Sequence, residues 1–152
     1  MNKLYGLWAG ALAIVSLSLM LAGCPHELPV KIYGDVCLTP YKNYTYEICE
    51  DLLIEINHHP IIVPLDFKTD LASIPRTFWS IYSPAKTEYI LPAIVHDYLY
   101  TCEQTYSREQ ADNIFYNLLV KNNVPYFRAY LFYCGTRLFG EKYYHVGCTD
   151  NL

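Results

Sequence analysis

The hydrophobic pattern of the chain changes its period near the middle. Between Val30 and Phe67 there are short segments rich in β-branched and aromatic residues, YTYEI, LLIEI and IIVPLDF. Such segments are typical of antiparallel strands, and LLIEINHHPIIVPL predicts a β-hairpin. Further along the chain, apolar residues recur at helical spacing. We therefore expect an α+β fold, in which a small antiparallel β-sheet or hairpin region is followed by a three-helix unit.

Three helices are expected in the second part of the chain. The first, YILPAIVHDYLYTC, is apolar on nearly all sides, so we expect it to be buried, with Pro92 in its first turn. The second, SREQADNIFYNLLVKNN, begins with a capping pattern formed by Ser107 and Gln110. The third, VPYFRAYLFYCGTRLFG, opens at Pro125 and closes near Gly140. We expect the first two helices to form an antiparallel hairpin.

The first residues have the composition of a secretory leader. One cation is followed by a long apolar run and then by small residues. The run ends in LAGC, which resembles a bacterial lipobox, where the leader is removed before the cysteine and the thiol of Cys24 carries lipid. An ordinary signal peptide or a single membrane span is the alternative. The expected organisation is a lipoprotein signal peptide over 1–23, a lipidated linker over 24–29 and a single globular domain over 30–152.

Composition limits the partners and the location. The chain has 152 residues, 53% of them hydrophobic, so it can bury one modest core. Its net charge is −4, and it has no basic cluster that could follow phosphates, so nucleic acid is not an expected partner. Lipidated Cys24 would hold the protein on a membrane of the cell envelope, facing the periplasm or the exterior. The expected partners are that membrane and either an envelope lipid or an outer-membrane protein.

Five cysteines follow the lipobox, and in an oxidising compartment most of them would pair. Cys37 and Cys49 flank a short turn-rich segment, so we expect a disulfide between them. We expect Cys148 to pair with either Cys102 or Cys134. The alternative is that the cysteines are buried reduced thiols.

The stretch AIVHDYLY places an imidazole and a carboxylate inside an otherwise apolar helix. The hairpin turn is expected near residue 104, which is eight residues after His96 and eight before Asp112. These two residues should therefore lie at the same height, with Asp112 at the rim of the apolar stripe of its helix. We expect Asp112 to orient His96 as a catalytic pair. Asp97 should face another polar group or a cation.

An imidazole held in this way has the properties of a general base, because a carboxylate on one ring nitrogen fixes the tautomer and raises the basicity. A carboxylate beside it can hold a divalent cation that polarises a carbonyl. We expect Asp97 and Asp70 as the ligands of such a cation, with Ser73 and Tyr100 as supporting residues. Two alternatives stay open. Asp70 caps a short turn, or the whole cluster is a satisfied structural network.

The blocks FKTDLASIPR, AIVHDYLY, SREQADNIFYNLLV and RAYLFYCGTRLFG, in this order, resemble a family associated with phages and prophages, domain of unknown function 1353. The resemblance covers Val63 to Gly140. It implies a phage origin and no established activity.

The His-Asp pair, the aromatic residue after it and the Asp on the partner helix are also similar to secreted phospholipase A(2). This resemblance implies that His96 is the base, Asp97 a calcium ligand and Asp112 the orienting carboxylate. Those enzymes hold calcium with a glycine-rich loop, whereas TDLASIPRTFW contains no glycine. Asp70 would have to replace the backbone ligands.

Two functions follow from these observations. The first is a lipid-anchored envelope protein of phage or prophage origin, whose His/Asp site acts as a metal-assisted, phospholipase-like hydrolase on an envelope component. The second is a non-catalytic surface lipoprotein that binds an envelope receptor, as in superinfection exclusion. The sixteen tyrosines favour the second function, because aromatic side chains with a polar tip are common in contact surfaces.

Overall fold

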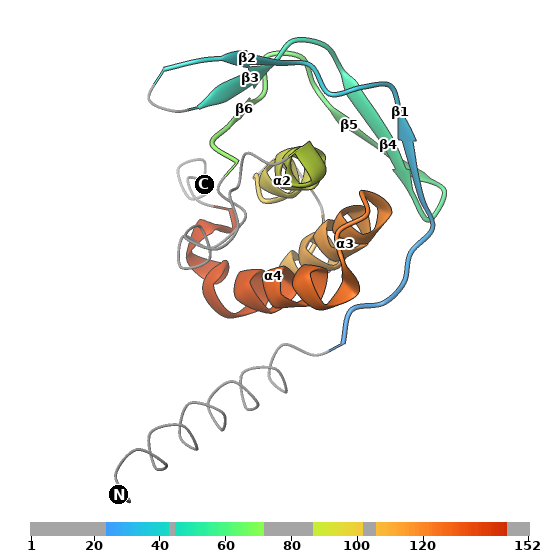
Figure 1. Ribbon diagram of the computed structural model, residues 1–152. Helices are drawn as coiled ribbons and strands as arrows, with labels where there is room; N and C mark the ends of the chain where they lie inside the picture. Colours follow the sequence, from blue (N-terminus) through green and yellow to red (C-terminus); the bar gives the residue numbers. More distant parts are fainter. Residues whose placement is uncertain (1–23, 43–44, 72–86, 102–105, 146–152) are drawn as a thin grey trace, which may run out of the picture.

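The structure, a computed structural model, describes residues 24–42, 45–71, 87–101 and 106–145 (Figure 1). The expected signal peptide, Ser73, Cys102 and Cys148 lie outside these ranges. Within them, all strands precede the α-helices, which confirms the predicted α+β fold. None of the helices in this part of the chain is long and apolar enough to cross a membrane.

The strands form two antiparallel sheets of three strands each. The first sheet has the order β1-β4-β5, with bounds Val30–Tyr33, Leu52–Ile56 and His59–Val63. The second has the order β2-β3-β6, with bounds Leu38–Pro40, Tyr46–Ile48 and Lys68–Thr69. Alternate residues of β4 are buried, because successive side chains of a strand point to opposite faces and one face covers the helices.

The predicted hairpin is confirmed as β4 and β5, which pair from Leu52 and Val63 to Ile56 and His59. Its two-residue turn consists of Asn57 and His58, with φ of 50° and 64°. Positive φ at both positions is the geometry of a type I′ turn, which matches the twist of the two strands. His59 is therefore the first residue of β5.

Three α-helices lie against the sheets, and a short 3-10 helix follows them. Their bounds are Thr87–Leu99 for α2, Arg108–Lys121 for α3, Tyr126–Phe139 for α4 and Glu141–Tyr143 for η2. In Figure 1, α2 lies next to the sheets and α4 lies on the far side of the helices. Helix α2 therefore lies between the sheets and the other helices, in the centre of the molecule. Its burial, predicted from the sequence, is confirmed.

Helix α2 begins earlier than expected, so the prediction that Pro92 lies in its first turn is wrong. The helix starts at Thr87, and Pro92 lies inside it. A proline has no N–H, so the Glu88 carbonyl four residues earlier loses its helical donor. The side-chain Nδ2 of Asn122 donates to that carbonyl instead, at 3.4 Å. The carbonyl is thus satisfied from outside its helix.

The starts of the other two helices follow the prediction. Ser107 Oγ accepts from the N–H of Gln110, and Gln110 Oε1 accepts from the N–H of Ser107, which is a complete capping box. Pro125 precedes α4 and Gly140 follows it. Local sequence patterns therefore fix both ends of α4 and the start of α3.

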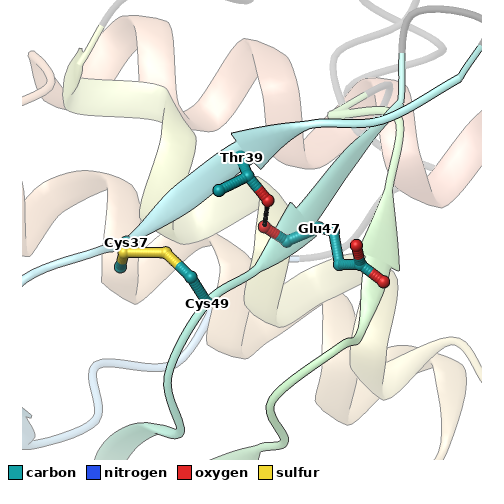
Figure 2. Close-up of a disulfide and its surroundings, with 4 residues drawn as sticks. All are labelled: Cys37, Thr39, Glu47 and Cys49. Atoms are coloured by element: carbon teal, nitrogen blue, oxygen red, sulfur yellow. Dashed lines mark hydrogen bonds between the residues drawn. A yellow bond between two sulfur atoms is a disulfide. The ribbon is translucent and has the colours of Figure 1, made fainter.

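Cys37 and Cys49 form the predicted disulfide, with their Cα atoms 5.3 Å apart (Figure 2). The bond lies beside the β2-β3 pair, where Thr39 Oγ1 also donates to the Glu47 carbonyl. Cys134 carries a free, buried thiol in α4, so it is not the partner of Cys148, and the alternative pair of Cys102 and Cys148 lies outside the described residues. The disulfide links the ends of two very short strands, which have few contacts of their own to hold them together.

Replacing both Cys37 and Cys49 by alanine should lower the free energy of unfolding by about 3 kcal/mol, because the cross-link restricts the unfolded chain. Chemical denaturation measures this change. A reductant should weaken the wild-type protein by a similar amount and leave the double variant unchanged. Equal stability of the oxidised wild type and the double variant would contradict the structural role of this bond.

Candidate functional site

His96 of α2 and Asp112 of α3 meet in the interior. His96 Nε2 lies 2.9 Å from Asp112 Oδ1, and the two residues are 3% and 0% exposed. The predicted equal height of these positions in the helix hairpin is thus present in the structure. The carboxylate of Asp112, expected at the rim of the apolar stripe of its helix, is turned toward α2 and is fully buried.

Asp112 has more partners than the sequence indicated. The Tyr100 hydroxyl, directly after α2, donates to Oδ1 at 2.5 Å. Arg137 of α4 donates to Oδ2 at 3.0 Å, and an Nη1 of Arg108 lies 3.9 Å from the same oxygen. Side chains from all three helices therefore converge on one buried carboxylate.

The two arginines were missed in the sequence. Arg108 lies four residues before Asp112, which is the spacing of a helical ion pair and could have been noticed. Arg137 is separated from Asp112 by 25 residues and comes from another helix. Only the packing of α4 on α3 reveals it.

These contacts determine the charge of the site. Burial acts to raise the pKa of Asp112, but hydrogen bonds from His96, Tyr100 and Arg137 outweigh it, and the pKa lies below the usual value. Burial and the Asp112 charge raise the pKa of Tyr100 far above its usual value. Tyr100 therefore stays protonated and donates, and Asp112 stays ionised.

The ionised carboxylate sets the tautomer of His96. Because the ionised Asp112 accepts at Nε2, this nitrogen carries a proton. The rings of Tyr100 and Phe115 lie 4.1 and 4.7 Å from the imidazole, centroid to centroid, and hold it in place. In the neutral form of such an imidazole, Nδ1 carries the lone pair that a general base requires.

Asp97 faces a different side of α2, as expected, and contacts the end of the second sheet. The hydroxyl of Thr69 donates to Asp97 Oδ2 at 2.5 Å and accepts from the N–H of Leu71 at 3.0 Å. Leu71 is buried and has a φ of 55°, in the left-handed region that non-glycine residues avoid. No pattern in the sequence indicates Thr69 as the partner of Asp97.

Of the two remaining predicted site residues, the structure describes one. Asp70 is exposed, between Thr69 and Leu71. Ser73 lies outside the described residues. Among the residues that are described, no group of three or more His, Cys, Asp or Glu side chains could hold a metal ion. Calcium at Asp97 and Asp70 therefore stays a prediction from the sequence.

The end of α4 closes over Tyr100. A Cβ added at Gly140 would lie 2.7 Å from the Tyr100 hydroxyl and would also meet the Thr136 carbonyl. The ring of Tyr144 packs edge-on against that of Tyr100 at 5.4 Å, and the His145 N–H donates to the Tyr100 carbonyl. Only glycine permits this approach at position 140, so the helix end and the network fit together.

Comparison with known proteins places this site in a family. The family described as Protein of unknown function (DUF1353) matches residues 46–136, which run from β3 to α4 and include His96, Asp97 and Asp112. The chain belongs to this family. In this DUF1353 protein, Arg137 is the first residue after the match, and Gly140 follows three residues later.

One relative of the DUF1353 protein is an uncharacterized protein, y4jT, of Sinorhizobium fredii. It is 32% identical over 82 residues, which are 53% of this chain and 24% of the relative. The match thus spans about a quarter of the length of that relative. No solved structure matches the chain.

Replacing Asp112 by asparagine should destabilise this DUF1353 protein by about 3 kcal/mol at neutral pH, since it leaves the buried donors around it without their charged partner. A carboxyl whose pKa is lowered by folding contributes stability above its unfolded pKa and loses it as the pH falls through the folded pKa. The difference between wild type and variant should therefore shrink below a pH of about 4. Denaturation at a series of pH values measures it.

Asp35→Asn provides the matched control, because Asp35 is exposed. This variant should keep wild-type stability across the same pH range. A loss of stability at neutral pH that is equal in the two variants would contradict a special role for the buried carboxylate.

Proposed function

We propose that the chain is a lipid-anchored envelope hydrolase of phage or prophage origin, and that His96 is its general base. The observation that carries this proposal is the hydrogen bond from His96 Nε2 to Asp112 Oδ1, which leaves the lone pair of the imidazole on Nδ1. Tyr100 and Arg137 keep Asp112 ionised and in position. The substrate class is an ester of an envelope lipid.

The proposed reaction is the attack of water on the ester carbonyl. His96 Nδ1 takes a proton from the water as its oxygen bonds to the carbonyl carbon. The ester C–O bond then breaks, and the proton passes from His96 to the leaving alcohol. Asp112 stabilises the imidazolium that forms between these two steps.

Two further observations support a hydrolytic site. The first is the resemblance of the His-Asp pair and the partner Asp to secreted phospholipase A(2). The second is the left-handed backbone of Leu71, because strained residues cluster at functional sites. Leu71 is bonded to Thr69, which in turn contacts Asp97, the residue that follows the proposed base.

The envelope location rests on the lipobox-like LAGC and on the Cys37–Cys49 disulfide, which forms and persists in oxidising compartments. In this proposal residues 1–23 are removed, Cys24 is acylated, and residues 30–152 form one domain. The loss of Lys3 with the leader changes the net charge from −4 to −5.

A second candidate function is a non-catalytic lipoprotein that binds an envelope receptor and excludes competing phages. Two observations favour it. His96 is only 3% exposed, as in a structural network, and several aromatic side chains are exposed, among them Tyr33 and Phe127. The two functions differ in whether the lone pair of His96 is needed.

The His96→Gln variant should release fatty acid from phospholipid vesicles about 100-fold more slowly than wild type, because glutamine has no basic nitrogen. The control is His59→Gln, which changes an exposed histidine on β5. Circular dichroism and melting show whether both variants are folded. Fatty acid release by wild type and by both variants is then compared with their protection of cells against phage infection.

Loss of release in His96→Gln alone supports the hydrolase. If none of the three proteins releases fatty acid and all three protect cells equally, the hydrolase is excluded in favour of the binding function.

Anchoring has its own test. The Cys24→Ser variant should no longer be labelled by radioactive palmitate, because serine lacks the thiol that carries the lipid. The Cys134→Ser variant is the control, since Cys134 is a free thiol within α4 and lies outside the LAGC pattern. Labelling that persists in Cys24→Ser would contradict the anchor.

A further inference from the structure

The segment before β1 is bound to α3 by specific hydrogen bonds. The His26 N–H donates to Asn113 Oδ1 at 2.7 Å, and the Leu28 N–H donates to Asn117 Oδ1 at 2.8 Å. Asn117 Nδ2 returns a bond to the His26 carbonyl at 2.8 Å. Two asparagines therefore pair with this segment much as a neighbouring strand would. This fixes where Cys24, two residues before His26, leaves the domain.

Cys24 lies beside α4. It lines a cavity of about 380 Å³ together with Tyr133 of α4 and with residues at the start of α3. Tyr130 and Cys134 of α4 are close enough to feel Cys24. Burial raises the pKa of both groups, and Cys24 adds to the rise to a smaller extent. In Figure 1 the chain runs from β1 past α3 to the side of the molecule opposite the sheets. An acyl chain on Cys24 would therefore emerge next to α4.

The start of α4 is apolar and exposed. Tyr126 and Phe127 are 65% and 71% exposed. Further along the same side of the helix, Cys134 is buried and Arg137 contacts the buried Asp112, so the exposed part of this side is its first turn. We call Tyr126 and Phe127 the α4 face.

We propose that the α4 face rests on the membrane that holds the acylated Cys24. The proposal depends on the anchoring of Cys24 proposed above. Tyrosine and phenylalanine are well suited to such contact, because amphipathic rings partition into the interface between headgroups and acyl chains. An anchor beside α4 brings the rings of the α4 face to the bilayer surface. Burial of these rings in the bilayer adds to the membrane affinity that the acyl chains supply.

The exposed apolar side chains of the first sheet do not compete for this role. Tyr33 and Ile62 are exposed on the first sheet, which lies on the far side of α2 from α4 (Figure 1). A bilayer at Cys24 cannot reach both sides of the domain at once. The position of the anchor therefore selects the α4 face.

This orientation also places the buried network relative to the lipid. Arg137, which contacts Asp112, belongs to α4 itself. A helix with its side chains is about 10 Å across, so the His96–Asp112 pair would lie roughly one helix diameter from the bilayer surface. An ester at the headgroup level is the substrate closest to such a site.

The experiment measures how deeply chosen positions enter the bilayer. The full chain, with Trp8→Phe and Trp79→Phe to remove native indoles, receives Phe127→Trp on the α4 face or Ile62→Trp on β5. Each protein is purified after palmitate labelling and reconstituted into phosphatidylethanolamine and phosphatidylglycerol vesicles that contain brominated phosphatidylcholine. Bromine quenches only an indole that enters the acyl region.

The indole at position 127 should lose most of its emission in brominated vesicles, whereas the indole at position 62 should keep its emission. Tyr126→Trp replaces Phe127→Trp if that variant does not fold, because Tyr126 lies on the same face. Labelled protein with equal emission at the two positions overturns the α4 face and leaves the anchor intact. Unlabelled protein overturns the anchor and the α4 face together.

Discussion

The burial of one negative charge governs the arrangement of the three helices. Asp112 is fully buried, and an ionised carboxylate in an apolar interior is very unfavourable unless it is paired and hydrogen-bonded. The structure meets this requirement with Tyr100 after α2, with Arg137 of α4 and with His96 of α2. Each helix therefore has a contact that depends on the positions of the other two. Apolar packing alone would permit more ways of fitting them together.

The part of this arrangement that could be predicted is local or periodic. The offsets of His96 and Asp112 from the hairpin turn brought them to one height, and the capping box and the hairpin β4-β5 followed from short patterns. What could not be predicted depends on tertiary packing. The Arg137 contact joins two helices, and the Thr69 contact joins a sheet to α2. A helical wheel places Asp112 at the edge of the apolar stripe of its helix, but it shows one helix and cannot give the neighbours that bury the carboxylate.

The contacts of Asp112 can serve both the stability of the fold and the chemistry of His96. A carboxylate that is held ionised fixes the imidazole tautomer, which a base requires, and it also ties α2 to α3. The strained backbone at Leu71 is linked through Thr69 to Asp97, in the last turn of α2. Gly140 approaches Tyr100, which directly follows that helix. Packing there is specific in a way that a purely apolar helix bundle does not need. This specificity is the reason for placing the proposed site around His96.

The last helix completes the network, and this has a consequence for the order of folding. Ribosomes and export channels deliver a chain from its N-terminus, so α2 and α3 emerge before Arg137 of α4. Until then the Asp112 carboxylate lacks the hydrogen bond from Arg137 and is better solvated by water than by the incomplete interior. The hairpin of α2 and α3 should therefore stay open to solvent during emergence. Its closure would wait for nearly the whole domain to leave the channel.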